Sequence, residues 1–305
     1  MSQRLNSLQQ WFDNEAVAPP TSGIDWLRVL PFLALHLAVE SVFWVGVSPI
    51  AIVAAVLMYA IRMFAITGFY HRYFSHRTFK TSRWLQFVFA FIAATAAQRG
   101  PLWWASHHRH HHRHSDTAED AHSAARGFWW SHLGWFLDGA NFNARHELVA
   151  DLSRYPELRF LDRYDFVAPI LAALGLFALG AWLESAMPEL HTSGEQMLAW
   201  GFVVSTLVLY HATFTINSLA HRIGSRRYAT LDSSRNNAWL ALLTFGEGWH
   251  NNHHHFPGSA RQGFYWWEVD LTWYGLKLLS WLGLIWDMKP VPTRIRAARR
   301  EGEAA

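Results

Sequence analysis

Four long apolar stretches constrain the fold of this 305-residue chain more than any other feature. They cover approximately residues 26–45, 49–69, 166–187 and 196–216. A helix needs about 20 mostly apolar residues to cross the hydrocarbon core of a bilayer. Because the mean hydropathy of the whole chain is only +0.01, a large polar part must accompany these spans. The sequence therefore predicts an all-α integral membrane protein with four transmembrane helices.

The remaining residues predict a helical cap at one end of the spans. We expect the cap to be formed by residues 70–165 and 217–290, within a single domain that covers residues 1–305. Two shorter apolar segments belong to it. Residues 85–97 are too few to cross a bilayer and fit a re-entrant or interfacial helix. Residues 271–286 contain Lys277 within an apolar pattern and fit a helix that lies on the membrane surface.

The basic residues predict which side of the membrane the cap occupies. The connections between the first and second spans and between the third and fourth contain no Lys or Arg. The opposite ends are followed by Arg72, Arg77, Arg222 and the C-terminal arginines. Because Lys and Arg are enriched in cytoplasmic loops, we expect both termini and the cap to be cytoplasmic. The arginines then flank the lipid bilayer, and nucleic acid is not an expected partner.

Clusters of histidine follow the ends of these spans and indicate a metal centre. Histidines 108, 111 and 112 are spaced i, i+3, i+4, and the same spacing recurs at 250, 253 and 254. Residues at this spacing share one face of a helix. Asn217 and His221, at i and i+4, also share a face. Neutral imidazole is the commonest metal ligand in proteins, so the three sets predict metal-binding faces.

His71 and His76 do not fit this pattern. Their i, i+5 spacing places them about 140° apart on an ideal α-helix. Either the helix end unwinds there, or the two residues bind different ions. Together the candidates are nine histidines and one asparagine, more than the four to six ligands of a single ion, so the sequence predicts two ions.

The other histidines of the chain are interpreted differently. Isolated histidines are more often core or interface residues than ligands, and this interpretation applies to His36, His132, His146, His191 and His211. The roles of His107, His110 and His114, which accompany the second cluster, stay open. The chain has no cysteine, which excludes thiolate ligands and cysteine-ligated iron–sulfur clusters.

The motifs in their order resemble those of the integral-membrane fatty acid desaturases, specifically the acyl-CoA Δ9 branch. They read HRYFSH at 71–76, HRHHH at 108–112, NSLAH at 217–221 and GEGWHNNHHHFP at 246–257. The segment RGFWWSHLGW at 126–135 also matches, and the resemblance covers roughly residues 25–290. It implies four transmembrane helices under a cytosolic cap that holds a di-iron site. The direct ligands that it implies are His71, His76, His108, His111, His112, His221, His250, His253 and His254, with Asn217 acting through a bound water.

The resemblance also implies residues that contact the substrate. Gln98 and Trp104 match positions that line the acyl tunnel, and Tyr59 matches the position that closes its deep end. Phe214 stands where the animal enzymes have a tryptophan. An Arg-Asp pair that contacts coenzyme A in those enzymes is Ser106 and His107 here. The expected carrier is acyl-CoA, with acyl carrier protein and a lipid as alternatives.

The function implied is an O₂-dependent desaturase that inserts a cis double bond, at Δ9, into a saturated C16–C18 acyl thioester. Two iron ions would be the cofactor and O₂ the co-substrate, because general acid–base chemistry cannot break an unactivated C–H bond. The chain has no motif for flavin, haem or an iron–sulfur cluster, so we expect a separate electron donor, such as a ferredoxin or a cytochrome b5-like protein. The alternatives are a histidine di-iron hydroxylase or alkane monooxygenase, and a non-catalytic metal transporter.

Two further expectations concern charged residues. Carboxylates commonly orient metal-binding imidazoles through their second nitrogen, and the nearest candidates in sequence are Asp116, Glu119, Asp120 and Glu247. Arg62 lies inside the second span, where an ionised side chain needs a partner. Glu40 on the first span is the expected charge partner, and the alternatives are snorkelling of the Arg62 side chain or contact with a buried water.

Overall fold

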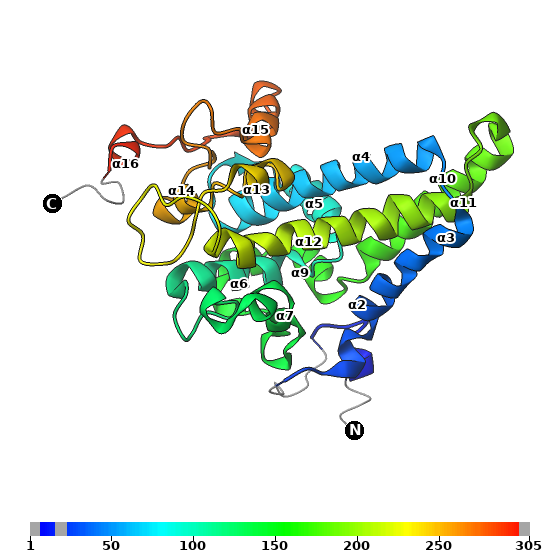
Figure 1. Cartoon of the computed structure of the whole chain (residues 1–305), viewed down its shortest axis with the longest axis horizontal. Helices are drawn as coiled ribbons and strands as arrows, with labels where there is room; N and C mark the ends of the chain where they lie inside the picture. Colours follow the sequence, from blue (N-terminus) through cyan, green and yellow to red (C-terminus); the bar gives the residue numbers. More distant parts are fainter. Residues whose placement is uncertain (1–6, 16–22, 299–305) are drawn as a thin grey trace.

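The computed structural model describes residues 7–15 and 23–298, and its architecture is almost entirely helical (Figure 1). Four long helical segments form an elongated bundle, and shorter helices gather at one end of it as a cap. The long segments are Trp26–Val45, Pro49–Ser75, Val167–Ala186 and Gly194–His221, each long and apolar enough to cross a membrane. The predicted fold class is confirmed, and the second and fourth segments continue further into the cap than predicted.

The first two spans form the tight hairpin that their short connection requires. The first span consists of α2 (Trp26–Ala38), the 3₁₀ turn η1 (Val39–Ser41) and α3 (Val42–Val45). Gly46 then adopts a φ of +68°, a left-handed conformation that glycine tolerates best. The chain reverses into α4 (Pro49–Ala65), which Ser48 caps by accepting a hydrogen bond from the amide of Ala51.

The third and fourth spans approach each other closely at the end far from the cap. The third is α10 (Val167–Ala186), and the fourth contains α11 (Gly194–Gln196), the π-helix η8 (Met197–Val204), α12 (Ser205–Ser218) and η9 (Leu219–His221). A Cβ atom on Gly180 would lie 2.4 Å from the carbonyl oxygen of Ser193. Glycine at position 180 therefore permits the two backbones to touch, as small residues commonly do in membrane helix packing.

The cap is built from short helices and one small sheet. Its α-helices are α5 (Arg83–Ala94), α6 (Pro101–His114), α7 (Trp135–Leu137), α8 (Ala150–Ser153), α9 (Pro156–Arg163), α13 (Ala238–Leu243), α14 (His250–His255), α15 (Leu271–Trp281) and α16 (Thr293–Arg296). Short 3₁₀ or π turns are η3 (Ala124–Arg126), η4 (Trp130–Gly134), η5 (Gly139–Asn141), η6 (His146–Leu148) and η7 (Pro188–Leu190), the last at the far end of α10. The apolar segment near residues 85–97 forms α5, which is too short to span a membrane, as expected.

The predicted helix over 271–286 is wrong in its last five residues. Helix α15 ends at Trp281, and Gly283 comes two residues later with a φ of +70°. Ile285–Trp286 then forms strand β2, antiparallel to β1 (Lys80–Thr81). The apolar pattern was correct, but the glycine ends the helix, and backbone pairing with the distant segment β1 makes residues 285 and 286 extended.

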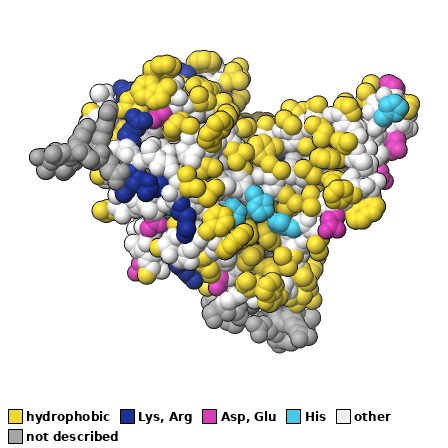
Figure 2. All heavy atoms as spheres, viewed as in Figure 1, with side chains coloured by type: hydrophobic (Ala, Val, Ile, Leu, Met, Phe, Trp, Pro, Cys, Tyr) yellow, Lys and Arg dark blue, Asp and Glu magenta, His cyan; other side chains and the backbone are white. Residues whose placement is uncertain are grey.

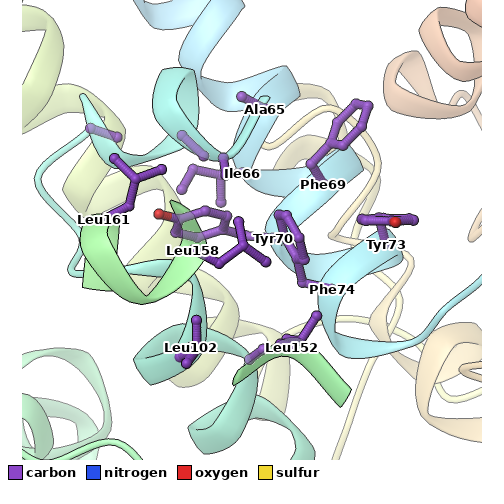
Figure 3. Packing of buried hydrophobic residues seen from close by; sticks show 14 of the residues in the cluster. Ala65, Ile66, Phe69, Tyr70, Tyr73, Phe74, Leu102, Leu152, Leu158 and Leu161 are labelled. Carbon is purple, nitrogen blue, oxygen red and sulfur yellow. The ribbon is translucent and has the colours of Figure 1, made fainter. Parts of the chain in front are cut away.

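The main hydrophobic core surrounds the cap end of the second span, where α4 continues as the π-helix η2 (Ile66–Ser75). Figure 3 shows Tyr70 and Phe74 of η2 packed toward the leucines of α6, α8 and α9. On another side of η2, Phe69 stacks on Phe89 with ring centroids 3.8 Å apart. This packing fixes the position of η2, which carries the first histidine motif.

The surface has an apolar part over the spans and a more polar part over the cap, as in a membrane protein. In Figure 2 hydrophobic side chains cover the long helices, Lys and Arg gather at the cap end, and acidic side chains lie both there and at the opposite tip. Large apolar side chains on the spans are freely exposed, for example Phe43 at 84% and Leu174 at 60%. Such exposure is unfavourable in water and normal against lipid.

The expected pairing of Arg62 with Glu40 is wrong. Arg62 is completely buried, whereas Glu40 is exposed. The guanidinium instead donates to four neutral oxygens on three different elements: the carbonyls of Met58 and Thr95 and the hydroxyls of Ser205 and Thr206. It therefore joins the second span to the fourth, and within residues 7–15 and 23–298 its partners are neutral oxygens and no carboxylate.

Candidate metal centre

The first histidine motif is shaped by the π-helix η2. The amide of His76 donates to the carbonyl of His71 at 3.3 Å, an i→i+5 hydrogen bond. This wider turn brings residues five apart onto nearly one face, which an α-helix cannot do. The two imidazole centroids are consequently 5.0 Å apart. The structure thus places both residues in one group, and a wider helical turn is what achieves it.

The second motif lies on α6, whose start is fixed by a residue from another helix. Oδ1 of Asp162 on α9 accepts hydrogen bonds from the backbone amides of Leu102 (2.9 Å) and Trp103 (2.7 Å). These are amides that a helix N-terminus otherwise leaves unpaired. A Cβ atom at Gly100 would lie 2.2 Å from Cα of Asp162, so glycine is required there. Burial raises the pKa of this carboxyl to about 7.

The third motif lies on α14, which comes after a tight turn. Gly246 has a φ of +123°, and a Cβ atom there would lie 2.4 Å from Oδ1 of Asp270. The turn brings the helix next to the end of α12 and η9, where His221 lies. Nε2 of His221 is 3.1 Å from Nε2 of His250.

Together these elements bring the nine predicted histidines into two groups. Within each group, one ligand atom per residue lies within 4.8 Å of every other. The first, here called the five-histidine group, contains His71, His76, His108, His112 and His253. The second, the four-histidine group, contains His111, His221, His250 and His254. Asn217 belongs to neither set of imidazoles, but lies in the last turn of α12 and lines the cavity beside His250.

Helices α6 and α14 each contribute to both groups. On α6, the histidines at i and i+4 join the five-histidine group and the one at i+3 joins the other. On α14 the assignment is reversed. Positions i and i+4 differ by about 40° around a helix, whereas i+3 lies about 60° to the other side of i. A single face of each helix can therefore serve two neighbouring ions.

Carboxylates orient one histidine of the five-histidine group and three of the other. Glu247 accepts from Nδ1 of His71, and Gln262 lies beside both. The remaining pairs are His111–Asp120 (3.0 Å), His221–Asp116 (3.2 Å) and His254–Asp232 (2.9 Å), each through Nδ1. Glu119, also expected here, instead accepts from Thr117 at the surface. Asp232 and Gln262 were missed because nothing in their local sequence marks them as neighbours of the histidines.

The hydrogen bonds between these histidines and carboxylates leave the Nε2 atoms available to bind a cation. Burial alone would raise the pKa values of Asp120 and Asp232, but contacts with histidine and hydrogen bonds lower both below their ordinary value. Both are thus carboxylates, and Nδ1 of His111 and of His254 must carry the proton that each accepts. The Nε2 atoms of these two histidines lie 3.4 Å apart, and in the neutral rings both would present lone pairs to each other. A metal ion between them would remove this repulsion.

Burial favours the neutral form of four further candidate ligands. It lowers the pKa of His108, His112, His250 and His253 well below the ordinary value, with neighbouring histidines adding to the effect. Neutral imidazole is the form that binds metal. Both groups contain nitrogen ligands alone, a set that suits iron, copper or zinc.

The accessory histidines take separate positions. His110 and His114 stack on each other outside both groups, and His107 contacts the carbonyl oxygen of Asn143 at 3.2 Å. His122, which sequence reasoning overlooked, is buried with its ring centroid 4.1 Å from that of His111. It forms a third possible ligand set with His111 and Asp120. Its signal in the sequence was the short spacing from Asp120.

The five isolated histidines lie outside the groups as well. Three of them form a hydrogen-bonded row, with His211 between His36 (3.3 Å) and His132 (3.1 Å). His146 and His191 are exposed on the surface.

A cavity of about 580 Å³ extends from the histidine groups into the bundle. His71, His108 and His250 line one end, and its walls are mostly apolar and aromatic side chains from α2, α10, η8 and α12. Of the predicted substrate contacts, Gln98, Trp104 and Phe214 line it. Trp104 stacks on His108 (5.1 Å), and Gln98 donates to the hydroxyl of Thr213 (2.8 Å).

Tyr59, the fourth predicted substrate contact, is not brought to this cavity. Its hydroxyl donates to the carbonyl of Leu243 at 2.5 Å, and its ring packs edge-on against Phe245. The structure thus gives Tyr59 a role in joining α4 to the cap, and the cavity wall is built by other residues.

Comparisons with known proteins agree with this geometry. Residues 47–282 match the family model described as fatty acid desaturase. The chain is 38% identical over 273 residues to an sn-1 stearoyl-lipid 9-desaturase from Anabaena variabilis, covering 87% of this chain and 94% of that protein. It is 40% identical over 221 residues to an acyl-CoA C20 Delta5-desaturase from Anemone leveillei, covering 72% and 66%. A palmitoyl-monogalactosyldiacylglycerol delta-7 desaturase from Arabidopsis thaliana is 39% identical over 214 residues, covering 69% and 54%.

Proposed function

Because this chain belongs to the fatty acid desaturase family, we propose that it inserts a cis double bond at Δ9 of a saturated C16–C18 acyl group. The observation that carries this proposal is the cavity, which joins an apolar space of about 580 Å³ to the converging histidines. Methylene groups offer no polar handle, so such a substrate must be positioned by the shape of its pocket. The match to a stearoyl-lipid 9-desaturase over most of both chains supports the Δ9 position.

Two iron ions are the proposed cofactor, one in each histidine group. When bound, the two ions would use O₂ and two external electrons to oxidise an unactivated C–H bond. The side chains hold and orient this centre: Glu247 fixes the ring of His71, and Asp232 fixes that of His254. Deleting such an orienting carboxylate typically lowers metal affinity 10–100-fold.

The proposed role of the cavity walls is to exclude water and to bend the acyl chain. Trp104 covers His108 on the cavity side, and Phe214 packs beside Phe136 with ring centroids 4.9 Å apart. The hydrogen bond between Gln98 and Thr213 ties the loop after α5 to α12 along the same wall. These residues are the proposed substrate contacts.

The electrons must come from a separate protein, for which we propose a ferredoxin or a cytochrome b5-like donor. The basic cap end in Figure 2 is the surface that an acidic donor would approach. The same distribution of basic residues supports a cytoplasmic cap and cytoplasmic termini. The terminal residues themselves lie outside the described part of the chain.

Product analysis tests the proposal. The full chain is expressed in a host with a suitable electron donor and fed stearic or palmitic acid, and derivatised fatty acids are analysed by mass spectrometry. We expect a Δ9 monoene, its loss in His71→Ala, and its retention in the exposed control His146→Ala. Hydroxylated acids would instead identify a hydroxylase, and metal-loaded protein without any product would favour a metal carrier.

A further inference from the structure

A buried arginine lines the part of the cavity that the N-terminal residues form. Gln10, Trp11 and Asn14 line this part together with Arg28 in the first turn of α2. Arg28 is only 7% exposed. Its Nη2 donates to Oδ1 of Asn14 (3.2 Å), and its guanidinium carbon lies 4.1 Å from the centroid of the Phe142 ring.

The hydrogen-bonding capacity of this guanidinium is incompletely used. Nη1 of Arg28 has no acceptor, and among the described residues no carboxylate is in ion-pair contact with it. A buried charged donor without an acceptor is unfavourable, because it has lost its hydrogen bonds to water. The other arginine of the lining, Arg99, is neutralised by Asp165 at 3.0 Å and also donates to the carbonyl of Phe142 at 2.9 Å. Among the described lining residues, Arg28 is therefore the arginine that has no ion pair and has a guanidinium nitrogen without an acceptor.

Aromatic residues place this part of the cavity at the membrane surface. Trp26, which starts the first span, is 65% exposed, and Phe12 is 56% exposed beside Phe166. Exposed aromatic side chains at the end of a span are typical of the membrane–water interface. The ester groups of glycerolipids lie at the same depth.

We infer that Arg28 binds the ester carbonyl oxygen of a membrane glycerolipid whose acyl chain occupies the cavity. This inference rests on the proposed function and specifies its acyl carrier. One ester oxygen needs one donor, which Arg28 supplies. The several phosphate groups of coenzyme A would need a cluster of cations, and the described lining has one arginine without an ion pair to a carboxylate.

This contact would also set the position of the double bond. With the carbonyl held at Arg28, the carbon that reaches the histidine groups is determined by the number of methylenes between them. The register is then counted from the ester end of the chain, and the apolar walls keep the intervening segment in one path.

The test uses the purified, iron-loaded full chain in lipid nanodiscs with an electron donor. The substrates are a distearoyl galactolipid, which is uncharged, distearoyl phosphatidylglycerol, which carries a phosphate, and stearoyl-CoA. The variants are Arg28→Met, Arg28→Lys as the charge-retaining variant, and Arg154→Met as an exposed control that contacts Tyr155. Retention of radiolabelled distearoyl lipid by metal-free protein measures binding independently of turnover.

We expect the wild type to desaturate both lipids. In Arg28→Met, the KM and the lipid dissociation constant should both be about tenfold higher, because losing a hydrogen bond to a charged group weakens binding by about this factor. Arg28→Lys should recover part of the affinity, Arg154→Met should match wild type, and Arg28→Met should yield mixed double-bond positions. Unchanged KM, binding and position in Arg28→Met would overturn the inference, as would turnover of stearoyl-CoA alone. If Arg28→Met weakened the binding of phosphatidylglycerol but not that of the galactolipid, Arg28 would be assigned to a headgroup phosphate and the ester contact would be overturned. Wild type that desaturates none of the three would refute the proposed function itself.

Discussion

Asp162 should make the stability of this protein fall as the pH rises towards neutrality. Its carboxyl is buried beneath the start of α6, and burial raises its pKa from 3.8 to about 7. In the unfolded chain the group has lost its proton by about pH 5. Between these pKa values the folded protein holds a proton that the unfolded chain has released, so the free energy of unfolding decreases with pH. The decrease ends above about pH 7, where both states are ionised.

The pKa difference sets the size of the effect. Each pKa unit corresponds to about 1.4 kcal/mol, so the change from 3.8 to about 7 amounts to at most about 4 kcal/mol. The positive end of the α6 dipole favours the ionised form and makes the real value smaller. Asp162→Asn keeps an oxygen that can accept from the amides of Leu102 and Trp103 but cannot ionise. We therefore expect this variant to gain stability relative to wild type as the pH rises, by up to several degrees in melting temperature.

The assay is thermal unfolding of the detergent-solubilised protein from about pH 5 to 8.5, with Asp151→Asn as the matched control. Burial alone would raise the pKa of Asp151, but hydrogen bonds from Arg109 and Arg77 lower it to about 2. Its stabilising contribution is lost only below about pH 4, so Asp151→Asn should lose stability by the same amount throughout the assay range. Parallel melting curves for wild type and Asp162→Asn over that range would refute the reasoning.

The metal-orienting carboxylates and the contacts between spans can be tested in the same protein. Asp232→Asn should weaken metal retention 10–100-fold by equilibrium dialysis, whereas Glu119→Gln should leave it unchanged. Arg62→Leu should destabilise the protein by roughly 1–3 kcal/mol in thermal unfolding, because it leaves buried oxygens of the fourth span without a donor. Gly180→Leu should lower the yield of folded protein, since its side chain would collide with the backbone of α11. Removal of metal by a chelator should lower the melting temperature, because the facing lone pairs of the histidines lose the cation between them.

The spans and the histidine sets were predictable because each depends on a local pattern. Twenty apolar residues in a row meet the length of the bilayer, and spacings of three and four residues report one face of a helix. These patterns need no knowledge of distant neighbours. In the structure, the histidines that these spacings select at 108, 111 and 112 do lie together with those at 250, 253 and 254.

The parts that sequence reasoning missed depend on contacts between distant segments. Asp232 lies 22 residues from His254, and the hydroxyls that bind Arg62 lie on the fourth span. No spacing rule connects such pairs. The i, i+5 pair of His71 and His76 was visible, but its meaning required the π-helix, which depends on the packing of Phe69, Tyr70 and Phe74 around η2.

The interleaving of the two histidine groups explains why their supports lie so far from them. Because α6 and α14 each contribute to both groups, any rotation or shift of either helix displaces ligands of both proposed ions together. The groups must therefore be held by the ends of the helices as well as by the carboxylates. Asp162 holds the first turn of α6, and the turn at Gly246 holds α14. A residue that does not contact the metal-binding histidines can thus control the spacing of both groups. Burying the Asp162 carboxyl for this purpose is unfavourable to its ionised form, which is why its pKa is raised.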